Sequence, residues 1–348
     1  MDRLARLTAA TCVALLAACG STPDEVPVPA SGDLCQRATG HGPKVGIAYD
    51  VGGRDDRGLN DLAFSGLTRA VKKLDATCLE GEAAEGELES ARAGRLSHLI
   101  DTGARVIVAV GTDYAEAVDD AARAHPRLRF ALIDGVAPTE GADKGGRANV
   151  AYLDFNTAQG VYVAGAAAAL ASKSGSVGFI GNELEESFKS GAEAANPKVK
   201  VTSTALPLDE ATTAEPVDAE SIATDQFNSG VDVIFGAPGV DERDLLNAAV
   251  DAGDEHWVVG YGSDQYVTAS DDQKEHVLTS ILKRYDTATY DFLASVAAGR
   301  PAAGQHTLGL KQRGLGYSTS GDFVKPIASD LDAFEAKVVA GDVVVPTR

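Results

Sequence analysis

The stretch Lys44-Val-Gly-Ile-Ala-Tyr49, followed at once by Asp50-Val-Gly-Gly53, has the pattern of a buried strand that ends in a polar loop. Residues 60–74 then carry apolar side chains at helical spacing. The same order recurs along the chain, with further strands expected over residues 105–110, 129–134, 176–181, 199–205, 231–235 and 256–260 and helices over 114–124, 157–171, 184–195, 220–229 and 242–251. Apolar strands that alternate with amphipathic helices predict α/β architecture, with doubly wound parallel sheets and ligand sites at the carboxyl ends of the strands.

The number of these elements predicts two lobes. Later segments, a helix over 282–297, a strand over 306–310 and a helix over 330–340, are too few for a third domain and are expected to complete the first two. A length of 348 residues agrees with two sheets of this kind.

The charge of the chain argues against nucleic-acid binding. It has 51 acidic and 31 basic residues, a formal charge of -20, and such a surface repels phosphate backbones. There is no phosphate loop ending in Lys-Ser/Thr, no nucleophile-elbow serine and no His-Glu-x-x-His, and the six histidines are scattered. We therefore expect no cofactor, no metal and no enzymatic activity.

The first 18 residues have the layout of a secretory signal. Arg3 and Arg6 precede an apolar run too short to span a bilayer, which ends in Leu16-Ala-Ala-Cys19. This ending resembles the bacterial lipobox and predicts a lipid on Cys19; the alternative is an ordinary signal peptide with an accidental cysteine. Residues 19–42 are proline-rich and are expected to be a tether. The body would then be lipid-anchored on the outside of the cytoplasmic membrane.

Two further cysteines, Cys35 and Cys78, would lie in an oxidising compartment and are expected to form a disulfide. The alternative is two free thiols, with Cys78 buried as a small apolar residue.

Several motifs in collinear order resemble the basic membrane protein family, whose members are substrate-binding lipoproteins of ABC importers. The opening motif is Asp50-Val-Gly-Gly-Arg-Asp-Asp-Arg-Gly-Leu-Asn60. The others are Phe130-Ala-Leu-Ile-Asp134, Asn149-Val-Ala-Tyr152, residues 165–173, Gly175-Ser-Val-Gly-Phe-Ile-Gly181, Val259-Gly-Tyr-Gly-Ser-Asp-Gln265 and Thr279-Ser-Ile-Leu-Lys-Arg-Tyr-Asp286.

The resemblance implies a type I periplasmic-binding-protein fold, in which two lobes joined by three crossovers trap a purine nucleoside for an ABC permease and its ATPase. On this basis lobe 1 is expected to comprise residues 43–153 and 264–310, and lobe 2 residues 154–263 and 311–348. The crossovers are expected near residues 152–156, 260–265 and 311–319.

Ligand contacts are expected from six residues. Four follow predicted strands or open a helix, namely Asp50, Asn60, Asp134 and Gly239. The resemblance adds Asp264 and Lys283, with the lysine donating to a ribose hydroxyl while a carboxylate holds it. The alternatives are a loop cap for Asp50, a helix cap for Asn60, ordinary turns at Asp134 and Gly239, and a surface ion pair of Asp264 and Lys283.

Two positions depart from the family's motifs. Leu59 stands where an aromatic residue usually precedes the asparagine, and Gly262 stands where an aspartate is usual. These departures weaken a purine-nucleoside assignment. A receptor of the same fold that senses another solute, and a secreted nucleoside-processing enzyme, are the alternative functions.

Overall fold

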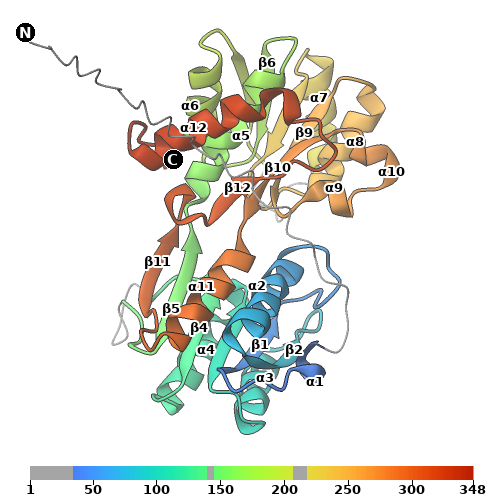
Figure 1. The fold of residues 1–348 in the computed structure, drawn as a ribbon. Coiled ribbons are helices and arrows are strands. Elements are labelled where there is room, and N and C mark those ends of the chain that lie inside the picture. The colour runs from blue at the N-terminus through green and yellow to red at the C-terminus, as the bar shows by residue number, and fades with distance from the viewer. Residues whose placement is uncertain (1–33, 139–144, 207–217, 348) are drawn as a thin grey trace, which may run out of the picture.

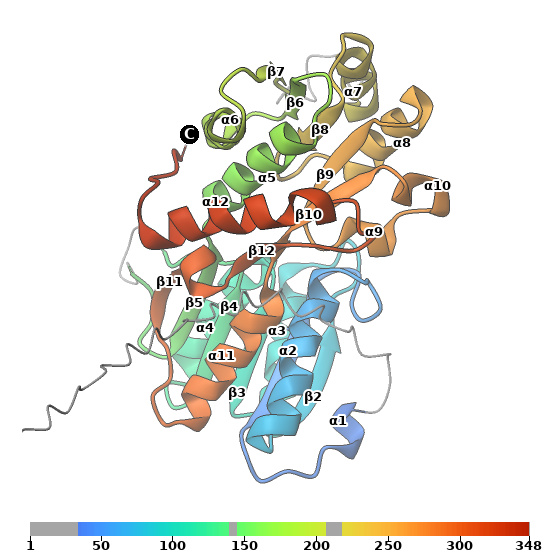
Figure 2. The same ribbon diagram turned by 45° about the horizontal axis from the view of Figure 1, so that its top comes forward.

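The computed structural model describes residues 34–138, 145–206 and 218–347, so the expected signal peptide and Cys19 lie outside the described residues. Figures 1 and 2 show two lobes, each a sheet with helices on both faces. Cys35 and Cys78 form the expected disulfide, which fastens α1 (Leu34–Arg37) to the edge of lobe 1.

The sheet of lobe 1 has six parallel strands in the order β11-β5-β4-β3-β1-β2. They are β1 (Lys44–Tyr49), β2 (Thr77–Glu82), β3 (Val106–Val110), β4 (Arg129–Ile133), β5 (Val150–Phe155) and β11 (Gly304–Leu308). Its helices are α2 (Leu59–Leu74), α3 (Glu89–Asp101), η1 (Thr112–Tyr114), α4 (Ala115–Ala124) and α11 (Tyr285–Ala297).

The sheet of lobe 2 has the order β12-β10-β9-β8-β6-β7, and only its edge strand β12 is antiparallel. The strands are β6 (Ser176–Ile180), β7 (Lys200–Thr204), β8 (Val233–Gly236), β9 (Trp257–Gly262), β10 (Val277–Lys283) and β12 (Leu315–Tyr317). The helices are α5 (Thr157–Ala171), α6 (Glu185–Ala195), α7 (Ala219–Asn228), α8 (Glu242–Ala252), α9 (Gln265–Thr268), α10 (Asp271–Lys274), η2 (Leu310–Gln312), η3 (Lys325–Ile327) and α12 (Ala328–Ala340).

Each sheet is doubly wound: successive strands are added toward opposite edges of the sheet on the two sides of the β1/β3 boundary in lobe 1 and of the β6/β8 boundary in lobe 2. Such switch points leave a crevice at the carboxyl ends of the strands. The apolar strands expected from the sequence form the cores: residues such as Ile47, Val108, Phe179 and Val233 have no exposed surface. The predicted two-lobed periplasmic-binding-protein fold is thereby confirmed.

The boundary expected near residue 264 is wrong. Strand β10 pairs with β9 in the second sheet, so residues 264–283 belong to lobe 2 and the chain crosses to lobe 1 at Arg284, not near 260–265. The helix expected over 282–297 accordingly begins at Tyr285. Strand β10 escaped detection because two of its buried residues are polar: Thr279 donates to the Ser318 carbonyl, and the Ser280 hydroxyl accepts from the Gln265 amide.

Three chain crossings join the lobes, at residue 156, at residue 284 and over residues 309–314, and we call these residues the hinge. Hydrogen bonds connect them. The amide of Asn156 donates to the Leu308 carbonyl at 3.1 Å, and the amide of Arg284 donates to the Gly314 carbonyl at 2.9 Å. The three crossings therefore form one connected unit.

Removal of the disulfide should lower the stability of the fold. The two cysteines are 43 residues apart, and a cross-link over a loop of this length is expected to contribute about 4 kcal/mol by restricting the unfolded chain. Urea denaturation of a Cys35→Ala/Cys78→Ala variant should show this loss, and reduced wild-type protein should approach the variant. Equal midpoints for oxidised wild type and variant would contradict the expectation.

Candidate functional site

An ion pair between the lobes lies at the hinge. Lys283, the last residue of β10, donates to both carboxylate oxygens of Asp134, at 2.9 Å and 2.7 Å. The hydroxyl of Tyr285 donates to the same carboxylate at 2.9 Å. The structure therefore brings Asp134 and Lys283 together, and the carboxylate that holds the lysine is Asp134 of lobe 1, 149 residues away in sequence.

Aromatic rings surround this ion pair. Phe155 stacks on Tyr285 with ring centroids 5.3 Å apart, and the Lys283 ammonium lies 5.7 Å from the Phe155 ring and 5.6 Å from the Tyr261 ring. Burial, reinforced by the charge of Asp134, raises the pKa of Tyr285 well above its usual value. The tyrosine hydroxyl thus stays protonated and remains a hydrogen-bond donor.

The hinge pair opens onto a cavity between the lobes. This cavity has a volume of about 450 Å³, which is in the usual range for small-molecule sites. We call it the interlobe cavity; it is lined by Leu59 of lobe 1 and by Pro238, Gly239, Val240, Asp241, Glu242, Tyr261, Gly262 and Lys283. Carboxyl ends of strands β8, β9 and β10 thus converge on it, as the topology predicts.

Asp50 follows β1 at the switch point of lobe 1. Its Oδ1 accepts from the Val51 amide at 2.8 Å, and among the described residues no donor bonds to its Oδ2. Burial raises the pKa of this carboxyl, with a further contribution from Asp113. A side chain at Gly111 would collide with the Asp50 carboxylate, so the glycine allows the acid to lie against the end of β3. Asp50 therefore retains an oxygen for a ligand.

Asn60 bonds within its own loop. Its Oδ1 accepts from the Asp50 amide at 3.0 Å, and its Nδ2 donates to the carbonyls of Asp50 and Val51 at 3.4 Å and 3.3 Å. Asp56 accepts from the amides of Gly58, Asn60 and Asp61 at the start of α2. In this structure the Asn60 side chain holds the loop that carries Asp50 and is not the cap of α2, whose N-cap position is Gly58.

Asp264 is not brought to the hinge pair. Its Oδ1 accepts from the Tyr266 amide at 3.2 Å and caps α9, and its Oδ2 accepts from the hydroxyls of Ser318 and Ser320. These bonds connect two loops within lobe 2. Asp264 does not line the interlobe cavity.

Gly239 lies in the cavity wall, as do the two positions that depart from the family motifs. Gly239 and Gly262 have φ angles of 96° and 88°, a conformation that other residues rarely adopt. Leu59 is the first residue of α2 and presents an apolar side chain to the cavity. The departures at Leu59 and Gly262 therefore change the wall of the candidate site itself.

Sequence reasoning missed Glu242, which lines the cavity from the first turn of α8. Its Oε1 accepts from the Tyr261 amide at 3.3 Å. Burial raises the pKa of this carboxyl to about 7, although amides of Glu242 itself and of Tyr261 oppose the change. A lone glutamate at a helix start is common in any sequence, so only its position beside β9 reveals it. Tyr261 and Tyr285 lie within two of the family motifs, and the sequence alone does not indicate their place beside Lys283 and Asp134.

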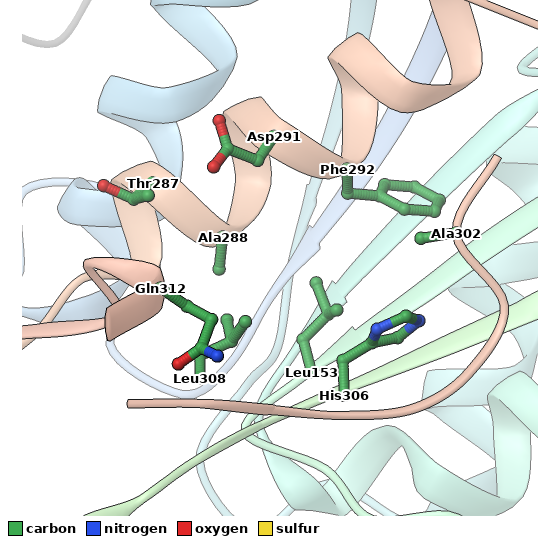
Figure 3. Close-up of a pocket in the computed structure, with 9 residues that line it drawn as sticks. All are labelled: Leu153, Thr287, Ala288, Asp291, Phe292, Ala302, His306, Leu308 and Gln312. Carbon is green, nitrogen blue, oxygen red and sulfur yellow. The ribbon is translucent and has the colours of Figure 1, made fainter. Parts of the chain in front are cut away.

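A second cavity, shown in Figure 3, lies inside lobe 1 between α11 and strands β5 and β11. Its volume is about 160 Å³, below the usual range for ligand sites, and the side chains of Leu153, Ala288, Phe292 and Leu308 gather there. The interlobe cavity is therefore the candidate site.

Residues 34–138, 145–206 and 218–347 show neither a metal site nor a membrane-spanning helix. Among those residues, no group of three or more His, Cys, Asp or Glu side chains is placed to hold a metal ion. Within those ranges no helix is both long and apolar enough to cross a membrane.

Two doubly wound lobes, a three-strand hinge and a ligand-sized cavity between them define a solute-binding protein of the kind that serves ABC transporters. Over residues 44–348 the chain matches the Bmp family, described as ABC transporter substrate-binding protein PnrA-like. The chain belongs to this family, which confirms the resemblance drawn from the sequence motifs.

Individual relatives agree with this assignment. The chain is 29% identical to the CD4+ T-cell-stimulating antigen of Listeria innocua, over 96% of this chain and 95% of that protein. It is 24% identical to the ABC transporter nucleoside-binding protein BmpA of Lactococcus lactis, over 88% of this chain and 89% of that protein. A solved solute-binding protein from Conexibacter woesei has a similar fold, with a TM-score of 0.69, 20% identity and coverage of 87% of this chain and 99% of that one.

The raised pKa of Glu242 predicts a pH dependence of stability. The pKa of Glu242 is about 7 in the folded protein and near 4.5 in the unfolded chain, so protonated Glu242 favours the folded state. The contribution of this group to the free energy of unfolding is fully present below pH 4.5 and is lost as the pH rises through 7. The difference in free energy of unfolding between Glu242→Gln and wild type should therefore shift by on the order of 2 kcal/mol, in favour of the variant, from pH 5 to pH 8. Urea denaturation at both pH values measures this, and parallel pH profiles would contradict it.

Proposed function

We propose that this protein is a lipid-anchored receptor that binds a purine nucleoside between its lobes and delivers it to the permease and ATPase of an ABC importer. The observation that carries the proposal is the hinge ion pair, in which the Asp134 carboxylate, itself bonded by the Tyr285 hydroxyl, holds the Lys283 ammonium beside the interlobe cavity. An ammonium has three donors, and two of its hydrogen bonds go to Asp134, so a further donor is available for a sugar hydroxyl.

The residues around the cavity suit an uncharged, polar ligand. Leu59 in the cavity wall offers an apolar surface for the face of a base, and Asp50, which is not one of the wall residues, offers a carboxylate oxygen at the lobe 1 switch point. The name of the Lactococcus lactis relative, a nucleoside-binding protein, supports the same ligand class. Binding groups from both lobes would favour the closed state when a ligand is present.

The anchor and the location are part of this proposal. The lipobox-like ending at Cys19 and the prolines that follow support attachment outside the cytoplasmic membrane. We propose a receptor without turnover, and incubation of pure protein with a bound nucleoside should leave the nucleoside intact.

Thermal unfolding against a panel of nucleosides, bases, sugars and amino acids tests the ligand class. A nucleoside at a hundred times its dissociation constant should stabilise the fold by ~2.7 kcal/mol, which gives a readable rise in Tm. Free bases should give a smaller rise, because they lack the sugar that Lys283 contacts. A shift with another solute but with no nucleoside would reject the nucleoside assignment and keep the receptor.

Removal of the Lys283 ammonium should weaken binding. In Lys283→Met the nucleoside loses a charged donor, and we expect a loss of ~1–3 kcal/mol, or roughly 5- to 150-fold in Kd by calorimetry. Lys274→Met is the matched control, because Lys274 makes an exposed ion pair with Asp271 on α10. Equal affinity in wild type and Lys283→Met would remove this lysine from the site.

A further inference from the structure

Glu242 is a carboxyl group in the wall of the interlobe cavity that the hinge site does not use. It comes from lobe 2, where α8 lies beside β9, and one of its oxygens accepts from the Tyr261 amide. The cap of α8 is supplied by Asp241, whose Oδ1 accepts from the Arg243 amide at 2.9 Å. Glu242 is therefore not needed to begin the helix.

No cation compensates this acid among the described residues. Arg243, its neighbour in sequence, lies 3.8 Å from Asp241, and Lys283, the basic residue of the cavity wall, is held by Asp134 at 2.7 Å. The cavity wall therefore holds, on the side of α8, a carboxyl group without a cationic partner. A half-buried carboxyl in such surroundings is stabilised by a partner that donates hydrogen bonds, and its raised pKa agrees with the lack of one in the free protein.

The chemistry of the wall limits what that partner is. When ionised, the Glu242 carboxylate accepts about four hydrogen bonds and donates none, so besides the amides of Glu242 itself and of Tyr261 it has acceptor positions for two donors. Leu59, across the cavity from lobe 1, has no polar side-chain atom. A bound ligand that displaces solvent can supply these donors, and two adjacent N–H groups match the two oxygens of a carboxylate in a bidentate geometry.

We propose that Glu242 determines the specificity of the cavity by accepting hydrogen bonds from adjacent N–H groups of the ligand, and so selects a base with the donor edge of guanine. This inference rests on the proposed nucleoside function. Guanine presents a ring N–H beside an amino group, whereas hypoxanthine has the ring N–H alone and adenine has a ring acceptor at that position. The loss of a donor leaves part of a buried acceptor unpaired, which costs affinity.

Binding of guanosine and inosine to three proteins tests the proposal. The proteins are wild type, Glu242→Gln and the matched control Glu335→Gln, which changes a buried carboxyl of α12 whose pKa is also raised to about 7 by burial. Calorimetry should find guanosine bound about tenfold more tightly than inosine by wild type and by Glu335→Gln. In Glu242→Gln this preference should disappear, because the amide keeps an acceptor for Tyr261 but presents N–H donors to the ligand.

The ratio of the two affinities distinguishes recognition from a structural effect. A general distortion of the cavity would weaken both nucleosides alike and leave their ratio unchanged, which would overturn the role of Glu242 while the receptor function stands. If wild type bound guanosine and inosine with equal affinity, the proposed role of Glu242 would also be overturned, and the receptor function would still stand. Binding of neither nucleoside by wild type would overturn both this inference and the nucleoside function.

Discussion

The bond of Lys283 to Asp134 is the interaction on which the site depends. It joins the end of β10 in lobe 2 to the end of β4 in lobe 1, next to the three chain crossings of the hinge. A half-buried ion pair with aromatic rings around it tolerates little displacement, because either charge alone would be poorly solvated. The pair therefore fixes a charged donor at the floor of the interlobe cavity, and Tyr285 holds its carboxylate in place.

The two lobes contribute walls of different chemistry to the interlobe cavity above Lys283. Lobe 1 contributes Leu59, an apolar residue, and lobe 2 contributes the backbone of a glycine turn and the carboxyl of Glu242. A ligand that bears a phosphate does not suit this wall, because the charge of Lys283 is balanced by Asp134 while Glu242 has no cationic partner among the described residues. A ligand with hydroxyls at one end and N–H groups at the other could bond to Lys283 through the hydroxyls and to Glu242 through the N–H groups. Membership of the Bmp family shows that the chain is a substrate-binding protein, and the chemistry of the cavity wall agrees with the solute class that we propose.

Local pattern was a good guide to most strands and helices, and failed in identifiable places. Strand β2 is half-exposed and acidic, so it lacks the apolar run by which its neighbours were recognised. Strand β10 contains Thr279 and Ser280, whose buried hydroxyls are paired with distant loops. A strand stabilised by such partners does not show an uninterrupted apolar pattern, and the lobe boundary was misplaced as a result.

The sequence by itself determined the α/β architecture, the disulfide partners and the family, because these follow from periodicity, cysteine number and collinear motifs. It could also name Asp134 as a polar residue at a strand end, and the family resemblance added Lys283. Only the tertiary structure decided that Lys283 meets Asp134 while Asp264 bonds to serines within its own lobe, and that Glu242 faces the cavity. The physical reason is that the partner of a charged side chain is set by the packing of two sheets, which brings together residues 149 positions apart.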